Sequence, residues 1–147
     1  MKIQTKTFDE LSTDLLYALL RLRAEVFVVE QDCVYQDIDN KDQKAIHILG
    51  FEDSDLVAYT RFFAPGIYFE QASIGRVVVR TQHRGKSYGK EIMEASIAFA
   101  KANSYNSIKI SAQCYLDNFY KELGFIDTGE RYLEDGIPHQ AMTMELT

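Results

Sequence analysis

The chain of 147 residues has no tryptophan, only two prolines and two cysteines, and no long apolar run. A membrane-spanning helix needs roughly 18 consecutive apolar residues, so the sequence predicts none. Cys33 and Cys114 lie far apart and form no CxxC motif, which leads us to expect two reduced thiols in the cytoplasm. The histidines, His47, His83 and His139, show no paired spacing such as HExxH, and we therefore expect no metal site.

Positive charge is also scarce, because 16 Lys and Arg against 22 Asp and Glu give a formal net charge of −6. Broad binding of nucleic-acid phosphates requires clustered Lys and Arg, so we expect no nucleic-acid partner. Residues 1–6 alternate polar and apolar side chains and lack the apolar core of a signal peptide. We therefore expect one cytoplasmic domain, residues 1–147, without a membrane partner. The sequence makes no prediction of oligomeric state.

Apolar periodicity predicts the elements of the first half of the chain. These are a strand at 3–8, a helix at about 14–27, an ordered polar loop at 31–44, and strands at 45–52, 56–63 and 73–79. Ser12 and Thr13 offer N-cap hydroxyls to the helix, and Arg23 is a cation on its apolar face. Residues 67–69 are expected either to extend the sheet or to cross it.

The second half of the chain predicts a helix at 88–103, a strand at 107–112 and a short helix at 116–123. Gly124 is a natural residue to end that short helix. Strands at 125–132 and 139–146 then flank a turn at 134–138. The order β-α-β-β-β-α-β-α-β-β predicts an α/β fold with a mixed sheet covered by helices.

A candidate phosphate-binding loop, residues 82–89, lies between the apolar strand and the following helix. A helix N-terminus presents unpaired backbone N–H groups to an anion, and Gly85 and Gly89 let the backbone approach a bulky phosphate. Arg84 and Lys86 add positive charge, and Ser87 is small and carries a hydroxyl. A nucleotide-binding P-loop would need a glycine five residues before Gly85, and GxGxxG is absent. An ordinary solvated turn remains an alternative from the loop alone.

Two motifs in the right order resemble the GNAT superfamily of N-acyltransferases. Residues 82–87 match its Q/RxxGxG/A loop, with Ser87 in place of the usual Gly or Ala, and residues 119–125 match its FYxxxGF helix. Gln113 stands where many members carry an Asn that contacts the pantetheine arm of coenzyme A. Closer similarity to the ElaA-type branch comes from residues 26–31, 35–39, 47–50, 75–77 and 135–139. The resemblance covers nearly the whole chain.

This resemblance implies a mostly antiparallel central sheet and an N-acetyltransferase that uses acetyl-CoA as cosubstrate, without a metal. The acetyl group would pass directly to a primary amine, of a small molecule or a protein, within a ternary complex. A backbone N–H of Val77 or Val78 would polarise the thioester carbonyl, and Val77 and Val79 would pair with the pantetheine arm. The residues expected at coenzyme A are Val77, Val78, Val79, Gln82, Arg84, Gly85, Lys86, Ser87, Tyr88, Gly89 and Gln113. A non-catalytic domain that binds coenzyme A is the alternative.

Tyr120 is the candidate general acid, because a tyrosine with an ordinary pKa near 10 can donate a proton to a thiolate. Glu30, His47 and His139 are the candidate general bases, and a glutamate would need a raised pKa for this role. Cys114 as a nucleophile has no base beside it in sequence but stays open. Arg76 lies in an apolar strand and needs a partner. It either pairs with Glu30 or binds substrate together with it.

Overall fold

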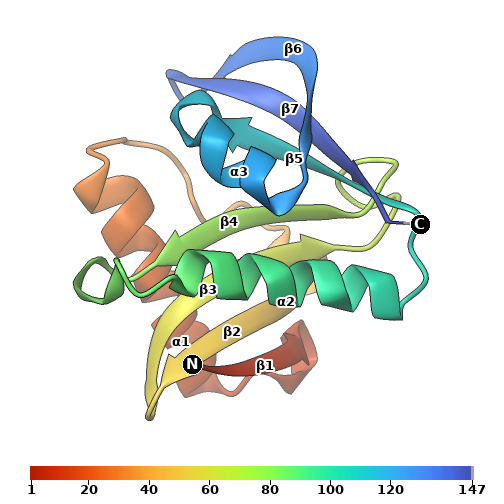
Figure 1. Cartoon of the computed structure of the whole chain (residues 1–147). Coiled ribbons are helices and arrows are strands. Elements are labelled where there is room, and N and C mark those ends of the chain that lie inside the picture. The colour runs from red at the N-terminus through yellow and green to blue at the C-terminus, as the bar shows by residue number, and fades with distance from the viewer. Residues whose placement is uncertain (147) are drawn as a thin grey trace.

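A computed structural model describes residues 1–146, and its strands form two antiparallel sheets (Figure 1). The first sheet has the order β1-β2-β3-β4, and the second has the order β5-β7-β6. The strands are β1 (Lys2–Thr7), β2 (Ile46–Glu52), β3 (Asp55–Phe63), β4 (Ser73–Val79), β5 (Ser107–Gln113), β6 (Ile126–Glu134) and β7 (Ile137–Glu145). The helices are α1 (Thr13–Arg23), α2 (Tyr88–Ala102) and α3 (Asp117–Leu123).

The two sheets meet only at one end of β4 and β5, where the strands run parallel. Ala72 and Ile108 form an isolated parallel bridge, and the N–H of Lys109 donates to the carbonyl of Ala72 at 2.8 Å. Beyond this point the strands diverge, as Figure 1 shows. The expected mixed, mostly antiparallel fold is confirmed, but the expected single sheet is divided between β4 and β5.

Helices α1 and α2 cover opposite faces of the first sheet (Figure 1). Successive strand residues point to opposite faces, so Ile48 packs in the cluster beneath α2 and Leu49 in the cluster beneath α1. The α2 cluster continues into the second sheet through Ile108 and Ile110 of β5. This shared core holds the two sheets together on the α2 side.

Most predicted elements are present, with three differences. The first helix begins after Ser12, whose Oγ accepts from the N–H of Leu15 at 3.1 Å, but it continues as a π-helical segment over Ala24–Glu30. Residues 67–69 form a turn and bends rather than a strand. The last hairpin turns at Asp135 and Gly136, so both of its strands are longer than expected. No helix in the described residues is long and apolar enough to cross a membrane.

Candidate active site

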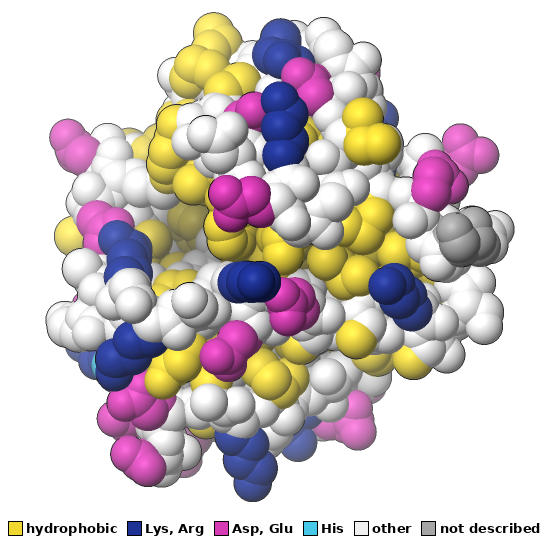
Figure 2. Space-filling view, in the orientation of Figure 1, with side chains coloured by type: hydrophobic (Ala, Val, Ile, Leu, Met, Phe, Trp, Pro, Cys, Tyr) yellow, Lys and Arg dark blue, Asp and Glu magenta, His cyan; other side chains and the backbone are white. Residues whose placement is uncertain are grey.

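A cleft of about 770 Å³ opens where the two sheets diverge. It runs from the phosphate-binding loop along β4 to α3 and the β6–β7 hairpin, so segments from both halves of the chain line it. In Figure 2 the molecule is hollowed left of centre, with apolar side chains on the walls and charged side chains around the rim. An elongated ligand with a charged end and an apolar arm suits this combination.

The phosphate-binding loop has two residues in the left-handed region of backbone space. Gly85 has φ 85°, which explains the glycine, since a Cβ there would meet no atom within 4 Å and crowding is not the cause. Ser87, the N-cap of α2, has φ 64° and makes no side-chain cap, so the first N–H groups of α2 have no partner from its side chain. Gly89 has no unusual angle, and a Cβ there would make an ordinary 3.5 Å contact with Phe119.

The charged side chains of this loop are held by carboxylates. Arg84 pairs with Glu30 at 2.8 Å between Nη1 and Oε2, and its Nε donates to the carbonyl of Val79 at 3.2 Å. Lys86 pairs with Glu52 at 3.2 Å between Nζ and Oε2. Of the residues in this loop that were expected at coenzyme A, Gln82 and Lys86 do not line the cleft. The others do: Arg84, Gly85, Ser87, Tyr88 and Gly89.

Strand β4 presents a backbone edge to the cleft, on which the carbonyl of Val79 already accepts from Arg84 Nε. The N–H of Arg80 donates to the carbonyl of Val57 at 2.8 Å, which marks this as a hydrogen-bonded antiparallel pair. Such pairs alternate along the strands, so the backbone N–H and C=O groups of Val78 are directed to β3. The same groups of Val77 and Val79 are directed away from β3, toward the cleft. Of the two expected carbonyl-polarising residues, the geometry therefore favours Val77 over Val78.

Tyr120, on α3, lines the cleft with only 6% of its surface exposed. Burial raises the pKa of its hydroxyl above the ordinary value, so the group stays protonated at neutral pH. Its ring packs edge-on against Phe119 and Phe125 at 5.1 and 6.0 Å between centroids. Gln113, at the end of β5, lines the cleft as well. The arrangement keeps a proton donor within the apolar part of the cleft.

His139, on β7, lines the cleft from the second sheet. Its Nδ1 donates to the carbonyl of Ile137 at 2.7 Å, since a carbonyl only accepts, and this leaves Nε2 as the ring nitrogen that can exchange a proton. Nε2 lies 3.4 Å from Oε2 of Glu134, a carboxylate that would stabilise a protonated ring. This pair has the chemistry of a general base with its supporting anion.

His47 lies outside the cleft and is fully buried. One ring nitrogen is 2.6 Å from the hydroxyl of Tyr59, and the other is 2.9 Å from the carbonyl of Asp42. Burial also lowers the pKa of His47. Because both nitrogens are occupied and no substrate can reach them, the structure contradicts our prediction of His47 as a base and gives it a packing role.

Glu30 lines the cleft at the end of the π-helical segment, but its environment does not favour the predicted role as a base. The Thr81 hydroxyl donates to one carboxylate oxygen, and Arg84 pairs with the other. These two partners lower the pKa of Glu30, whereas a base near neutral pH would need it raised. Through these contacts Glu30 links the π-helical segment to the residues around the candidate phosphate-binding loop. Glu30 does not form the ion pair with Arg76 that was one of the two expectations from sequence.

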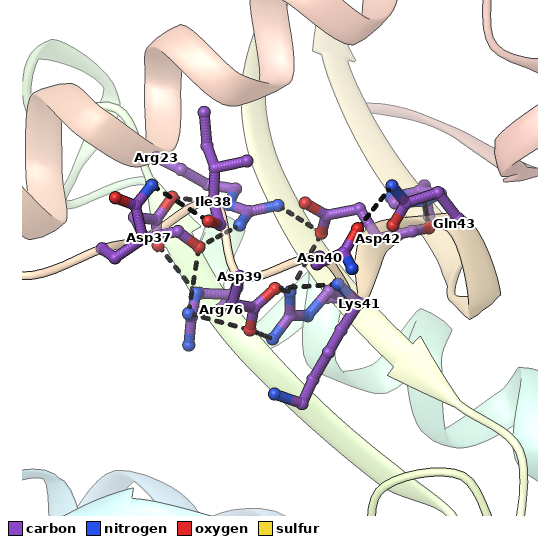
Figure 3. A network of polar contacts seen from close by, with 12 residues as sticks. Arg23, Asp37, Ile38, Asp39, Asn40, Lys41, Asp42, Gln43 and Arg76 are labelled. Atoms are coloured by element: carbon purple, nitrogen blue, oxygen red, sulfur yellow. Dashed lines mark hydrogen bonds and ion pairs between the residues drawn. The ribbon is translucent and has the colours of Figure 1, made fainter.

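Arg76 belongs instead to a closed ring of alternating charge, which we term the arginine–aspartate ring: Arg23, Asp37, Arg76, Asp39, Arg61 and Asp42 (Figure 3). Asp37 Oδ2 accepts from Arg23 Nε at 2.9 Å, and Asp37 Oδ1 lies 2.7 Å from Arg76 Nε, without hydrogen-bond alignment. Asp39 accepts from both Nη atoms of Arg61 at 2.8 Å, and from Arg76 Nη2 at 3.3 Å.

Asp42 closes the ring by contacting Arg23 at 2.7 Å and Arg61 at 2.9 Å. Burial acts to raise the pKa of Asp39, but the guanidinium groups of Arg61 and Arg76 outweigh it and hold the pKa at about 2. The three carboxylates all come from the loop at 31–44, which this ring fastens to α1, β3 and β4. The acidic loop is therefore neutralised from within, and its Asp37, Asp39 and Asp42 are not free to collect a cationic substrate.

Sequence reasoning did not predict this ring or the position of Glu134 beside His139. Two signals were present: Arg23 and Arg61 each interrupt an apolar pattern, and a buried arginine requires an acidic partner. The choice of partner depends on the path of an aperiodic loop, which the sequence pattern does not define. Among the described residues, no group of three His, Cys, Asp or Glu side chains could hold a metal ion.

Comparison with known proteins agrees with this architecture. The family model of the acetyltransferase (GNAT) domain matches residues 10–146. Protein ElaA of Escherichia coli K12 is 44% identical over 141 residues, covering 94% of this chain and 92% of ElaA. The crystal structure of Escherichia coli ElaA superposes with a TM-score of 0.90, at 41% identity over 99% of this chain and all of that chain (100%).

Two other solved structures share the fold. An acyl-CoA N-acyltransferase from Pseudomonas aeruginosa is 37% identical, with a TM-score of 0.90 and coverage of 98% of this chain and 99% of that one. An aminoglycoside 6'-N-acetyltransferase complexed with coenzyme A has a TM-score of 0.76 at 14% identity, covering 100% of this chain and 98% of that one. At that identity the second likeness concerns the fold alone.

Proposed function

The chain belongs to the GNAT acetyltransferase family, and on this premise we propose that it transfers an acetyl group from acetyl-CoA to a primary amine. The observation that carries the proposal is a single cleft lined by three kinds of feature. It joins the candidate phosphate-binding loop, the backbone edge of β4, and two proton-transfer candidates, Tyr120 and His139. The Pseudomonas relative is an acyl-CoA N-acyltransferase, and the aminoglycoside enzyme of the same fold binds coenzyme A.

Coenzyme A would lie along the cleft, with its pyrophosphate at the N-terminus of α2. There Gly85 and Ser87 turn the backbone, and the first N–H groups of the helix face the anion. The pantetheine arm would pair with Val77 and Val79 as an additional strand would, because their backbone groups are directed to the cleft. Gln113 offers an amide to the same arm from the facing strand.

In the proposed reaction, His139 Nε2 accepts a proton from the ammonium form of the amine, and Glu134, which lies beside the same nitrogen, stabilises the resulting imidazolium. The nitrogen lone pair then attacks the thioester carbonyl carbon, whose oxygen gains negative charge and accepts a hydrogen bond from the N–H of Val77. The C–S bond breaks, the leaving thiolate takes the proton of the Tyr120 hydroxyl, and the extra proton on the new amide nitrogen returns to the Tyr120 oxygen. Both substrates are bound together, and no acyl-enzyme is formed.

The proposal also includes a cytoplasmic location, which the free thiols of Cys33 and Cys114 support. A screen tests the proposal: acetyl-CoA is incubated with the protein and a panel of small amines, amino acids, aminoglycosides and peptides, and thiol release is followed. We expect release that depends on both the protein and one class of amine, and that falls when His139 is replaced by Gln. Tight binding of coenzyme A without transfer to any amine would instead indicate a non-catalytic coenzyme A-binding domain.

A further inference from the structure

Arg76 has a backbone conformation that arginine rarely adopts within a strand. Its φ is 49°, in the left-handed region, although it lies in the middle of β4. The Cβ of an L-residue crowds the following carbonyl oxygen in this region, so a residue other than glycine remains there only when its surroundings hold it. Contacts made by the Arg76 side chain must therefore hold its backbone at this angle.

The unusual angle coincides with a β-bulge. Gly75 pairs with Arg61 and Val78 pairs with Tyr59, so two residues of β4, Arg76 and Val77, lie opposite the single residue between those partners on β3. A bulge bends the strand and turns its backbone groups in a new direction. The residue that follows the left-handed angle is Val77, whose N–H is directed to the cleft. The orientation of that N–H therefore depends on the conformation of Arg76.

The restraint on Arg76 comes from the arginine–aspartate ring. Its Nε lies 2.7 Å from Asp37 Oδ1, and its Nη2 donates to the carbonyl of Asp37 at 3.2 Å and to Asp39 Oδ2 at 3.3 Å. Asp37 is itself 5% exposed and is held by Arg23, which is fully buried. The side chain of Arg76 is thus held within a closed ring of charges whose other arginines are buried.

We propose that Arg76 and Asp37 are positioning residues for acetyl transfer. Their ion pair holds Arg76 at its left-handed angle, which keeps the bulge in β4 and aims the Val77 N–H at the thioester carbonyl oxygen. Neither side chain needs to touch a substrate for this role. The inference rests on the proposed acetyltransferase function, and it assigns to Arg76 a purpose other than the substrate binding expected from sequence.

The test compares Arg76→Val with Arg76→Gly. Both variants lose the same charge and the same contacts, but glycine adopts the left-handed angle freely, whereas valine favours extended backbone. Loss of one donor to a developing oxyanion lowers kcat by about 10²–10³-fold, so we expect the valine variant to fall by that order. The glycine variant should retain at least about tenfold more kcat than the valine variant, with a similar KM for acetyl-CoA in both.

A second comparison uses Asp37→Asn in the parent protein and in the Arg76→Gly variant. We expect Asp37→Asn to lower kcat by about tenfold or more in the parent protein. In the Arg76→Gly variant the loss should be much smaller, because glycine adopts the left-handed angle without a restraint. Asp32→Asn is the matched control, since Asp32 lies in the same loop, outside the cleft, and forms no ion pair with the described residues. It should leave kcat unchanged. Thermal unfolding and coenzyme A titration confirm that each compared variant is folded and binds its cosubstrate.

Equal kcat for the folded valine and glycine variants would overturn the inference, and so would equal losses from Asp37→Asn in the two backgrounds. If Asp37→Asn does not fold, the valine and glycine pair decides alone. A parent protein that binds coenzyme A but acetylates no amine would refute the proposed function itself. An active parent whose valine and glycine variants have the same kcat would refute only the inference about Arg76. A crystal structure of the valine variant gives an independent measure, because we expect residue 76 to return to negative φ.

Discussion

Replacing Asp39 by Asn removes one carboxylate from the arginine–aspartate ring and keeps the shape of the side chain. In the folded protein the pKa of Asp39 is about 2, below its ordinary value of 3.8, because Arg61 and Arg76 outweigh the effect of burial. A lowered pKa stabilises the fold at every pH above the ordinary value, and this contribution is lost as the pH falls through about 2. At about 1.4 kcal/mol for each pH unit, the ionised side chain contributes about 2 kcal/mol at neutral pH.

Urea unfolding, followed by circular dichroism, measures this contribution in the parent protein and the Asp39→Asn variant. We expect the free energy of unfolding to differ by about 2 kcal/mol at pH 7 and by about 1 kcal/mol at pH 3, where Asp39 is partly protonated on unfolding. The side chain of Asp39 is 18% exposed, so solvent screening should remove little of the effect. A difference near zero at pH 7, or one that does not shrink in acid, would refute the reasoning.

Three further predictions concern the cleft. Tyr120→Phe should lower the single-turnover rate by about 10²–10⁴-fold and leave acetyl-CoA affinity unchanged; parental rates in a folded variant would make Tyr120 only a packed aromatic residue. Gly85→Val should weaken coenzyme A binding by about tenfold or more, measured by calorimetry, because valine resists φ 85°; unchanged affinity would exclude this loop as the pyrophosphate site. Ser87→Gly should raise the free energy of unfolding by up to about 1 kcal/mol by relieving its angle of 64°, and a loss of stability would contradict this.

The sequence predicted the parts of the site that depend on local chain geometry. The turn between β4 and α2 could be predicted because glycines between a strand and a helix mark a turn, and Gly85 has a positive φ there, whereas its binding of phosphate stays a prediction. The strand containing Val77 and Val79 was also clear from its β-branched residues. The family resemblance supplied Tyr120, which the structure brings to the same cleft.

What depends on long-range packing was not predictable. His47 and His139 were equal candidates in sequence, and both are buried, but one is enclosed by Tyr59 and Asp42 whereas the other lines the cleft. The division into two sheets follows from the meeting of β4 and β5 at one end, which the order of elements leaves open. The Arg76 bulge requires a left-handed arginine, and no periodicity predicts that angle.

Mass spectrometry of the protein and of its small-molecule products tests direct acetyl transfer most directly. The protein is incubated with acetyl-CoA, first alone and then with the amine identified by screening. We predict that the intact mass of the protein stays unchanged in both cases, and that one acetylated amine forms for each coenzyme A released. A protein acetylated at Cys33 or Cys114, able to pass its acetyl group to the amine after acetyl-CoA is removed, would contradict direct transfer in a ternary complex.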